Sequence, residues 1–266
     1  MILRLPRGYQ RLAGISPLAV AHDTVADALR EILTQGTLHD WARNHRERWE
    51  YQGRGPMYSA PLPAGPRVVV RHAWRGGLIA PLLRDLYLPP TPAPSELLIS
   101  HILTQVGVPT PPVLGFATYK AAALLRRADV VTVEVDGRDL AATLAEADPP
   151  GRRALAPVVA TLIGALTEAG AWHQDLNAKN ILLTQKADGT RLAVLLDVDR
   201  VRFMPSGDPH VRDANLARLQ RSIEKARAAG AVTFSEDDWA AVLARVQDDE
   251  EIRRATREAR ALDVMA

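Results

Sequence analysis

The hydrophobic pattern of this chain changes character near Asp136-Gly137, and that change constrains the fold more than any other feature. Before it, apolar runs are short and β-branched, as in Val68-Val69-Val70, which is typical of strands. After it, long Ala/Leu-rich stretches have helical spacing. The sequence therefore predicts an α+β architecture, with a strand-rich N-terminal part and a helical C-terminal part.

The N-terminal part carries the signals of a sheet with few helices. Residues 24–50 are predicted to be helical. A second helix is expected from Glu96 to about Val106. Ser95 fits its N-terminal cap and Gly107 its C-terminal cap. The expected strands are apolar or β-branched runs, at 67–71, 113–119, 121–126 and 128–135.

Two apolar runs in the C-terminal part predict a β-hairpin. Residues 181–183 and 192–196 flank Asp188-Gly189, and a turn dipeptide between apolar runs is a strong hairpin signal. Around the hairpin the pattern is helical, at 138–147, 151–170 and 212–264. We expect an N-terminal lobe over residues 1–135, with an N-terminal extension, and a C-terminal lobe over 136–266, forming one domain overall.

Composition limits the class of protein. With 266 residues and 47% hydrophobic content, the chain can bury a sizeable core. The absence of cysteine excludes disulfides and thiolate chemistry. A net charge of +2, without aromatic residues among the basic ones, does not indicate nucleic acid. Residues 1–15 lack the apolar core of a signal peptide, and no stretch approaches the ~20 apolar residues of a spanning helix, so we expect a cytosolic or peripheral membrane protein.

Positive charge is concentrated in two stretches of the chain. Their members are Arg67, Arg71, His72, Arg75 and Arg84 in the first, and Arg218, Arg221, Lys225 and Arg227 in the second. Such clusters can contact phosphate or an anionic membrane surface. For the second cluster, a solvated helix face is an equally good interpretation.

Three polar side chains flank the predicted hairpin. Asp175 and Asn180 precede its first strand, and Asp197 follows its second, so the hairpin brings them into one neighbourhood. Phosphoryl transfer needs a carboxylate beside the acceptor hydroxyl and hard oxygen ligands for Mg²⁺. These residues supply that set. In the alternative interpretation, Asp175 and Asn180 form turns and Asp197 caps an element.

The order His-x-Asp-Leu-x-x-x-Asn, followed by an Asp after an apolar strand, resembles the catalytic loop and metal-binding Asp of the protein-kinase-like superfamily. The resemblance implies a bilobal protein-kinase-like fold that uses ATP and Mg²⁺. It makes Asp175 the catalytic base and Asn180 and Asp197 the metal ligands. His173 takes the place of a residue with a mainly structural role.

In the N-terminal lobe the resemblance is less complete. Gly53-Arg54-Gly55 stands where the superfamily has its glycine-rich phosphate loop, without the full motif. Arg71 stands where a strand lysine holds the α- and β-phosphates, with Glu96 as its expected partner. Glu134 and Val135 fall at the inter-lobe hinge, whose backbone contacts adenine. The alternatives are a simple turn, a surface arginine and a glutamate that favours a helix start.

Departures from the protein-kinase pattern narrow the class of kinase. Gln174 replaces the Arg of His-Arg-Asp, and Asp199 replaces the Gly of Asp-Phe-Gly. No Ala-Pro-Glu element follows. These differences favour a kinase of a small molecule or a lipid-linked sugar over a regulated protein kinase.

Several short strings together resemble the lipopolysaccharide core kinases, most closely those that act on 3-deoxy-D-manno-octulosonic acid (Kdo). The strings are Gly53-Arg54-Gly55, Arg71-His72 with Arg75-Gly76-Gly77-Leu78, Asp85-Leu86-Tyr87-Leu88, Gly107-Val108-Pro109-Thr110-Pro111, His173-x-Asp175-Leu176-Asn177, Asp197-x-Asp199-Arg200 and Asn215-Leu216-x-Arg218-Leu219-x-Arg221-Ser222. The resemblance covers about residues 50–225. It implies ATP-dependent phosphorylation of a Kdo hydroxyl on the lipid A precursor, at the cytoplasmic face of a Gram-negative inner membrane.

An acidic acceptor would need basic residues near the reacting groups, and Arg200 and Arg202 are candidates. Residues 75–88, basic and then apolar, fit either a membrane contact or an ordinary buried helix. Two other functions stay open. One is a phosphotransferase of the aminoglycoside or choline kinase type, although such enzymes favour acidic pockets. The other is a non-catalytic pseudokinase, which only the missing lysine supports.

Overall fold

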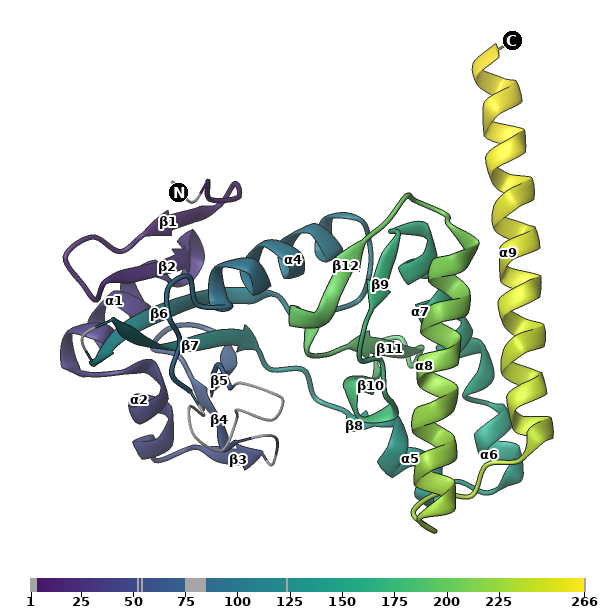
Figure 1. Ribbon diagram of the computed structural model, residues 1–266, viewed down its shortest axis with the longest axis horizontal. Coiled ribbons are helices and arrows are strands. Elements are labelled where there is room, and N and C mark those ends of the chain that lie inside the picture. The colour runs from purple at the N-terminus through teal and green to yellow at the C-terminus, as the bar shows by residue number, and fades with distance from the viewer. Residues whose placement is uncertain (1–3, 52, 54, 75–84, 123, 266) are drawn as a thin grey trace. The chain divides into compact units, whose positions relative to one another are not determined.

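The computed structural model describes residues 4–51, 53, 55–74, 85–122 and 124–265, with side chains through Glu251. It divides into two compact units. Unit 1 comprises Met1–Ile102 and Pro111–Val135, and unit 2 comprises Leu103–Thr110 and Asp136–Ala266. Unit 1 is rich in strands and unit 2 is mainly helical, which confirms the predicted α+β class (Figure 1).

Unit 1 is built on an antiparallel seven-stranded sheet with the order β1-β2-β6-β7-β5-β4-β3. The strands are β1 (Tyr9–Arg11), β2 (Leu18–His22), β3 (Trp49–Tyr51), β4 (Met57–Pro61), β5 (Arg67–His72), β6 (Val113–Ala122) and β7 (Leu125–Val133). The predicted strand at 67–71 is β5. The predicted strand at 128–135 lies largely in β7, which begins earlier, at Leu125. The predicted strand at 121–126 is wrong, because Ala121 and Ala122 end β6 and Leu125 and Arg126 begin β7.

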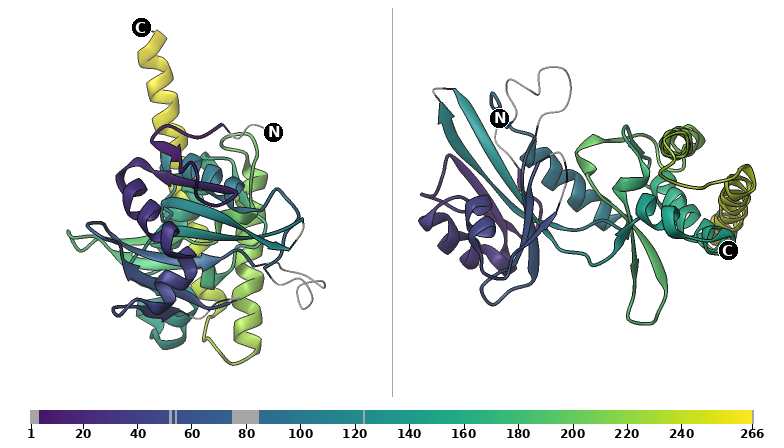
Figure 2. Two further views of the ribbon diagram at one scale, coloured as in Figure 1. Left: turned by 90° about the vertical axis from the view of Figure 1, so that its left-hand side faces the viewer. Right: turned by 90° about the horizontal axis from the view of Figure 1, so that it is seen from below.

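Helices cover both faces of this sheet (Figure 2). A short 3-10 turn, Asp23–Val25, leads into α1 (Ala26–Gln35), and α2 (Leu38–Asn44) follows. Leu29 of α1 and Leu38 of α2 share one buried cluster with Val68 and Val70 of β5. On the other face, α4 (Ala93–Gln105) packs Leu97 in a separate buried cluster. Because successive side chains of a strand point to opposite faces, the sheet contributes residues to two cores.

Two expectations for the helices of unit 1 need correction. The single helix predicted over 24–50 is instead α1, α2 and β3, because Gly36 ends α1 and Thr37 caps α2 with a side-chain hydrogen bond to the Asp40 N–H. Helix α4 begins at Ala93, so Ser95 lies inside its first turn rather than at its cap. Gly107 does adopt a left-handed φ of 80° just beyond the helix, as a C-terminal cap requires.

Unit 2 contains five helices among the residues that the structure describes. They are α5 (Leu140–Glu146), α6 (Pro149–Arg153), α7 (Ala156–Glu168), α8 (Pro209–Ala228) and α9 (Glu236–Met265). Aspartates cap the first two and α8 by accepting from backbone N–H groups. None of the helices described is long and apolar enough to cross a membrane.

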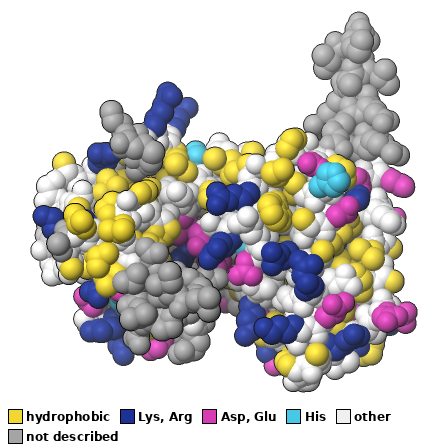
Figure 3. Space-filling model, in the orientation of Figure 1, with side chains coloured by type: hydrophobic (Ala, Val, Ile, Leu, Met, Phe, Trp, Pro, Cys, Tyr) yellow, Lys and Arg dark blue, Asp and Glu magenta, His cyan; other side chains and the backbone are white. Residues whose placement is uncertain are grey.

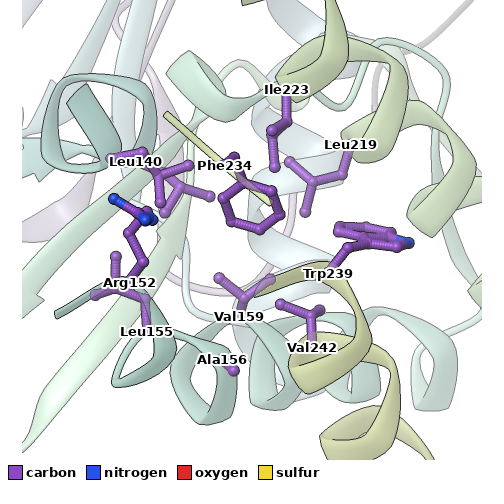
Figure 4. A pocket seen from close by; sticks show the side chains of 11 residues that line it. Leu140, Arg152, Leu155, Ala156, Val159, Leu219, Ile223, Phe234, Trp239 and Val242 are labelled. Carbon is purple, nitrogen blue, oxygen red and sulfur yellow. The ribbon is translucent and has the colours of Figure 1, made fainter. Parts of the chain in front are cut away.

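The helices of unit 2 enclose an apolar core. Leu219 of α8, Val159 of α7 and Val242 of α9 line a cavity of about 10 Å³ in it (Figure 4). A space this small holds one water at most. At its edge, Arg152 donates to Asp238 at 2.9 Å in a buried ion pair. This cavity is part of the core and not a ligand site.

Small sheets complete unit 2. β10 (Ile181–Gln185) pairs with β11 (Arg191–Leu195) and with β8 (Arg138–Asp139). β9 (Ala171–His173) pairs with β12 (Val201–Phe203). The β10–β11 pair is the predicted hairpin, and Gly189 at its turn has a φ of 83°.

Candidate functional site

The β10–β11 hairpin brings two of the predicted residues side by side. Ile181 pairs with Leu195, and the Leu196 N–H donates to the Asn180 carbonyl at 2.8 Å. Asn180 and Asp197 therefore occupy neighbouring positions at the open end of the hairpin. The sequence predicted this proximity from the turn alone.

The segment between β9 and β10 carries Asp175. A short 3-10 turn, Ala178–Asn180, ends this segment, and the Asn177 side chain caps it by accepting from the Lys179 and Asn180 N–H groups at 3.0 and 3.2 Å. The Asn177 and Asn180 amides both donate to the Asp175 carbonyl, at 3.2 and 3.1 Å. With its Nδ2 on that carbonyl, Asn180 presents its amide oxygen in another direction, as a metal ligand requires.

His173 links Asp175 to Asp197. Its side chain is fully buried, its Nδ1 accepts from the Asp175 N–H at 3.2 Å, and its Nε2 donates to the Asp197 carbonyl at 3.1 Å. This pattern requires a neutral imidazole with the proton on Nε2. Burial lowers the pKa of His173, which favours that neutral form. The structural role expected for this histidine agrees with these contacts.

Asp197 has an unusual backbone. Its φ of 55° and ψ of 53° lie in the left-handed region, which few residues other than glycine adopt. It immediately precedes the 3-10 turn Val198–Arg200. Backbone strain of this kind is concentrated at functional sites, where the surrounding structure holds it in place.

Helix α8 forms side-chain hydrogen bonds with this segment at two points. The buried Asn215 side chain accepts from the His173 N–H and donates to the Ala171 carbonyl, both at 3.0 Å. Ser222, two helical turns further on, accepts from the Ala178 N–H at 3.1 Å. Both residues belong to one of the strings that resemble the lipopolysaccharide core kinases, but the sequence alone predicted no role for them. Their seven-residue spacing, which places them on one helix face, was the available signal.

Arg200 and Arg202 lie beside this segment, on the turn after Asp197 and on β12. The Arg200 carbonyl accepts from the Gln174 N–H at 3.1 Å, and Arg202 pairs with Trp172 across β9 and β12. Both arginine side chains are exposed. Unit 2 therefore places all five predicted residues, Asp175, Asn180, Asp197, Arg200 and Arg202, on connected elements.

Unit 1 joins the predicted pair Arg71 and Glu96. Arg71 lies near the end of β5, and its guanidinium contacts the Glu96 carboxylate at 2.5 Å. The Glu96 side chain is 4% exposed and that of Arg71 is 21% exposed. A carboxylate this buried needs a cation beside it. Glu96 lies in the first turn of α4, as the alternative also expected, but the two side chains form a pair instead of being independent.

Glu134 follows β7 and is held by two side chains. It contacts Arg67 at 2.8 Å and accepts from the Tyr51 hydroxyl at 2.5 Å. Its N–H donates to the Arg67 carbonyl at 3.0 Å. A contact with adenine from this segment would therefore use the Glu134 carbonyl and the backbone of Val135.

The predicted glycine-rich turn is only partly described. Gly53 and Gly55 are described, and Arg54 lies outside the described residues, as do residues 75–84 of the expected membrane contact. A Cβ added to Gly55 would come within 2.2 Å of the Trp74 ring, so only glycine allows this ring to pack here. The close approach of the Trp74 ring to the backbone, and not an unusual φ, explains why residue 55 is glycine.

A stacked pair of histidines, of which His39 is buried, holds the end of that turn, and the sequence analysis did not identify it. The rings of His39 and His72 stack with centroids 3.8 Å apart. Asp129 accepts from the His39 N–H at 2.9 Å and contacts His72 Nδ1 at 2.5 Å. His39 Nε2 donates to the Pro56 carbonyl at 3.2 Å. The four residues lie far apart in the sequence, so no local pattern could reveal them.

The oxygen donors of unit 2 fit a magnesium ion better than a transition metal. Among the residues that the structure describes, no three His, Cys, Asp or Glu side chains form a metal cluster. Mg²⁺ does not need one, because it takes one or two carboxylates or amides and completes its shell with phosphates and water. The Asn180 amide oxygen and the Asp197 carboxylate suit that coordination.

Comparisons with known proteins agree with this geometry. The model of the lipopolysaccharide kinase (Kdo/WaaP) family matches residues 39–245. A 3-deoxy-D-manno-octulosonic acid kinase of Actinobacillus succinogenes is 34% identical over 218 residues, 78% of this chain and 88% of that protein. One of Pasteurella multocida is 30% identical over 214 residues, 78% and 87% respectively.

A solved structure shares the fold. WaaP in complex with acyl carrier protein matches with a TM-score of 0.51 at 18% sequence identity, covering 90% of this chain and 97% of that one. The fold is therefore protein-kinase-like, as expected. Since the family model covers most of the chain and the curated relatives align along most of their length, the chain belongs to the lipopolysaccharide kinase (Kdo/WaaP) family.

Proposed function

We propose that this chain transfers the γ-phosphate of ATP to a hydroxyl of Kdo on a lipid A precursor. The family consists of kinases, and the curated relatives are named for activity on Kdo. The observation that carries the proposal is the segment of unit 2 in which His173 holds the backbones of Asp175 and Asp197 while Asn180 binds the Asp175 carbonyl.

Asp175 is the proposed catalytic base. The acceptor oxygen attacks the γ-phosphorus, the bond from that phosphorus to the β–γ bridging oxygen breaks, and ADP leaves. The proton of the acceptor hydroxyl passes to the Asp175 carboxylate. The hydrogen bonds to the Asp175 N–H and carbonyl fix its backbone, so the carboxylate is positioned before substrate arrives.

Asn180 and Asp197 are the proposed magnesium ligands. When bound, Mg²⁺ would neutralise charge on the phosphates of ATP. The two residues are neighbours across the open end of the hairpin. The Asn180 amide nitrogen donates to the Asp175 carbonyl, and the Asp197 carbonyl accepts from His173.

Unit 1 is proposed to bind the nucleotide. Arg71, paired with Glu96, would contact the α- and β-phosphates in place of the superfamily lysine. The Gly53-Arg54-Gly55 turn would cover the phosphates with backbone N–H groups. The Glu134 carbonyl and the backbone of Val135 would contact adenine.

The acceptor defines the remaining proposals. Kdo carries a carboxylate, and the exposed Arg200 and Arg202 suit an acidic sugar. A lipid-linked acceptor lies in a membrane, so we place the enzyme peripherally at the cytoplasmic face of the inner membrane. Its basic residues would favour an anionic surface there.

Purified protein with ATP and Mg²⁺ tests the function directly. The acceptors are Kdo-lipid A, choline and an aminoglycoside, with transfer of the γ-phosphate as the readout. We expect transfer to Kdo-lipid A alone. Asp175→Ala should lower kcat by about a hundredfold or more, as expected for loss of a positioned base. Asp188→Asn, in the exposed hairpin turn, is the matched control and should keep full activity.

Two results would overturn these assignments. Transfer to none of the acceptors excludes the proposed reaction, and transfer to choline or the aminoglycoside reassigns the substrate. Activity of Asp175→Ala near the wild-type level removes Asp175 from the role of base.

A further inference from the structure

Two arginines of the string Asn215-Leu216-x-Arg218-Leu219-x-Arg221-Ser222 have no part in the structure described so far. Asn215 and Ser222 hold the segment that carries Asp175, and Leu219 is buried in the core. Arg218 and Arg221 are exposed. The packing of α8 therefore gives a structural role to Asn215, Leu219 and Ser222, but none to the two arginines.

Helical geometry places these cations beside the segment that carries Asp175. Arg218 lies four residues before Ser222 and Lys225 three residues after it, so both are its neighbours on the helix surface. Arg221 directly precedes Ser222. The Ser222 hydroxyl accepts from the Ala178 N–H at 3.1 Å.

The segment itself adds a fourth cation. Lys179 directly follows Ala178, and its side chain is exposed, like those of Arg218, Arg221 and Lys225. We call these four residues the cationic face. Figure 3 shows several Lys and Arg side chains on one surface of unit 2, with Asp and Glu side chains among them. All four belong to unit 2, as does Asp175.

Internal carboxylates do not neutralise this charge. Within the described ranges, none of the four cations forms an ion pair. The nearby Glu224 accepts from the Gln220 amide at 2.9 Å. Asp213 of α8 and Glu250 of α9 both pair with Arg212. Neighbouring like charges on a helix are unfavourable by themselves. An external anion would remove that repulsion.

We propose that the cationic face binds phosphate groups of the acceptor lipid, away from the hydroxyl that reacts. The inference rests on the proposed function and names the part of the acceptor that this surface recognises. Arginine suits this task because its planar fork binds phosphate through two parallel hydrogen bonds. Binding at this surface would hold the acceptor beside Asp175 without contributing to the chemical step.

Steady-state kinetics with two acceptors test the proposal. The acceptors are Kdo-lipid A with its phosphates and the same molecule after enzymatic dephosphorylation. For Arg218→Ala/Arg221→Ala, we expect KM for the phosphorylated acceptor to rise about tenfold or more, with kcat within about twofold of wild type. With the dephosphorylated acceptor, variant and wild type should have the same KM. Arg218→Lys/Arg221→Lys should recover part of the loss.

Arg227→Ala is the matched control. Arg227 is an exposed cation on α8, nine residues after Arg218 and thus roughly half a turn away around the helix. It should leave KM for both acceptors unchanged. An unchanged KM in the double variant, or an equal rise with both acceptors, would overturn the proposal.

A binding measurement separates this inference from the proposed function. Cosedimentation with vesicles that contain the phosphorylated or the dephosphorylated lipid needs no turnover. Wild-type protein should bind the phosphorylated lipid more tightly, and the double variant should lose that preference. If the wild type does not catalyse transfer but shows this preference, the proposed reaction is wrong, whereas the proposed phosphate binding by the cationic face is supported. If it catalyses transfer without the preference, the cationic face is wrong.

Discussion

At the scale of single residues, His173 fixes the backbone of the candidate site. One imidazole contacts the backbones of two residues that lie 22 positions apart in the sequence, Asp175 and Asp197. A protonated ring would carry hydrogen on both nitrogens and would lose its bond from the Asp175 N–H. The geometry of the site therefore depends on one proton staying off a buried ring.

Substitution of Arg71 tests its proposed contact with the nucleotide. We expect Arg71→Ala to raise KM for ATP about tenfold or more, because the proposed phosphate contact is lost. It should also destabilise unit 1, since the Glu96 carboxylate is left buried without its arginine. Arg71→Lys keeps a single positive charge and should raise KM only a few fold. Steady-state kinetics and thermal unfolding measure the two effects.

Arg43→Ala is the control for this prediction. Arg43 forms an exposed ion pair with Asp40 on α2 and should contribute little to stability or to nucleotide binding. If Arg71→Ala unfolds at a lower temperature but binds ATP as well as wild type does, Arg71 has a structural role only.

At the scale of elements, α8 fixes the segment that carries Asp175. Its two polar contacts, from Asn215 and Ser222, lie about 10 Å apart along the helix axis, as seven residues require. They meet the two ends of one short stretch of chain. A straight helix thus sets the length and position of an irregular segment.

Asn215 carries the prediction for this element. Asn215→Leu leaves the His173 N–H and the Ala171 carbonyl without a buried partner, so we expect kcat to fall about tenfold or more. KM for ATP should stay within about twofold, because this positioning residue does not contact the nucleotide in our proposal. Asn215→Asp can still accept from His173 and should retain more activity than Asn215→Leu.

Gln220→Ala on the same helix is the control, since Gln220 bonds only Glu224 among the described residues. It should leave kcat unchanged. Equal kcat values for Asn215→Leu and wild type would show that Asp175 does not depend on α8.

Elements with a strong local signal could be predicted from the sequence, and those set by tertiary contacts could not. The β10–β11 hairpin followed from Asp188-Gly189 between apolar runs. By contrast, β3 has no apolar alternation and exists because it pairs with β4 at the sheet edge. The same holds for the site: the segment 173–180 has a motif, whereas the contact of His39 with Pro56 depends on the whole fold of unit 1.

At the scale of the whole molecule, each unit contains a buried histidine that favours the neutral state. In unit 2 this is His173. In unit 1 it is His39, whose pKa is lowered first by burial and then by the neighbouring His72, while Asp129 and Asp40 act in the opposite direction. In the unfolded chain both histidines take up a proton near pH 6.5. The folded protein resists that uptake.

Stability should therefore fall as the pH falls. A lowered pKa in the folded state gives stability that is present above about pH 6.5 and is lost as the pH drops through the folded value. Between pH 7.5 and 5.5 we expect the unfolding temperature to decrease, and His39→Gln to reduce that decrease by about 2–4 °C. His210→Gln, at an exposed position, should behave like wild type. Identical pH profiles for His39→Gln and wild type would refute the role of His39.

The proposed role of Asp197 implies that the residue best for stability and the residue best for activity differ at this position. Glycine would adopt its φ of 55° without steric conflict, whereas a side chain there costs about 1 kcal/mol. Only a residue with a carboxylate, however, offers an anionic oxygen at the open end of the hairpin. If Asp197 binds Mg²⁺ as proposed, selection for thermal robustness alone would favour glycine and remove the activity. Robust variants from such a screen would then need a functional assay beside them.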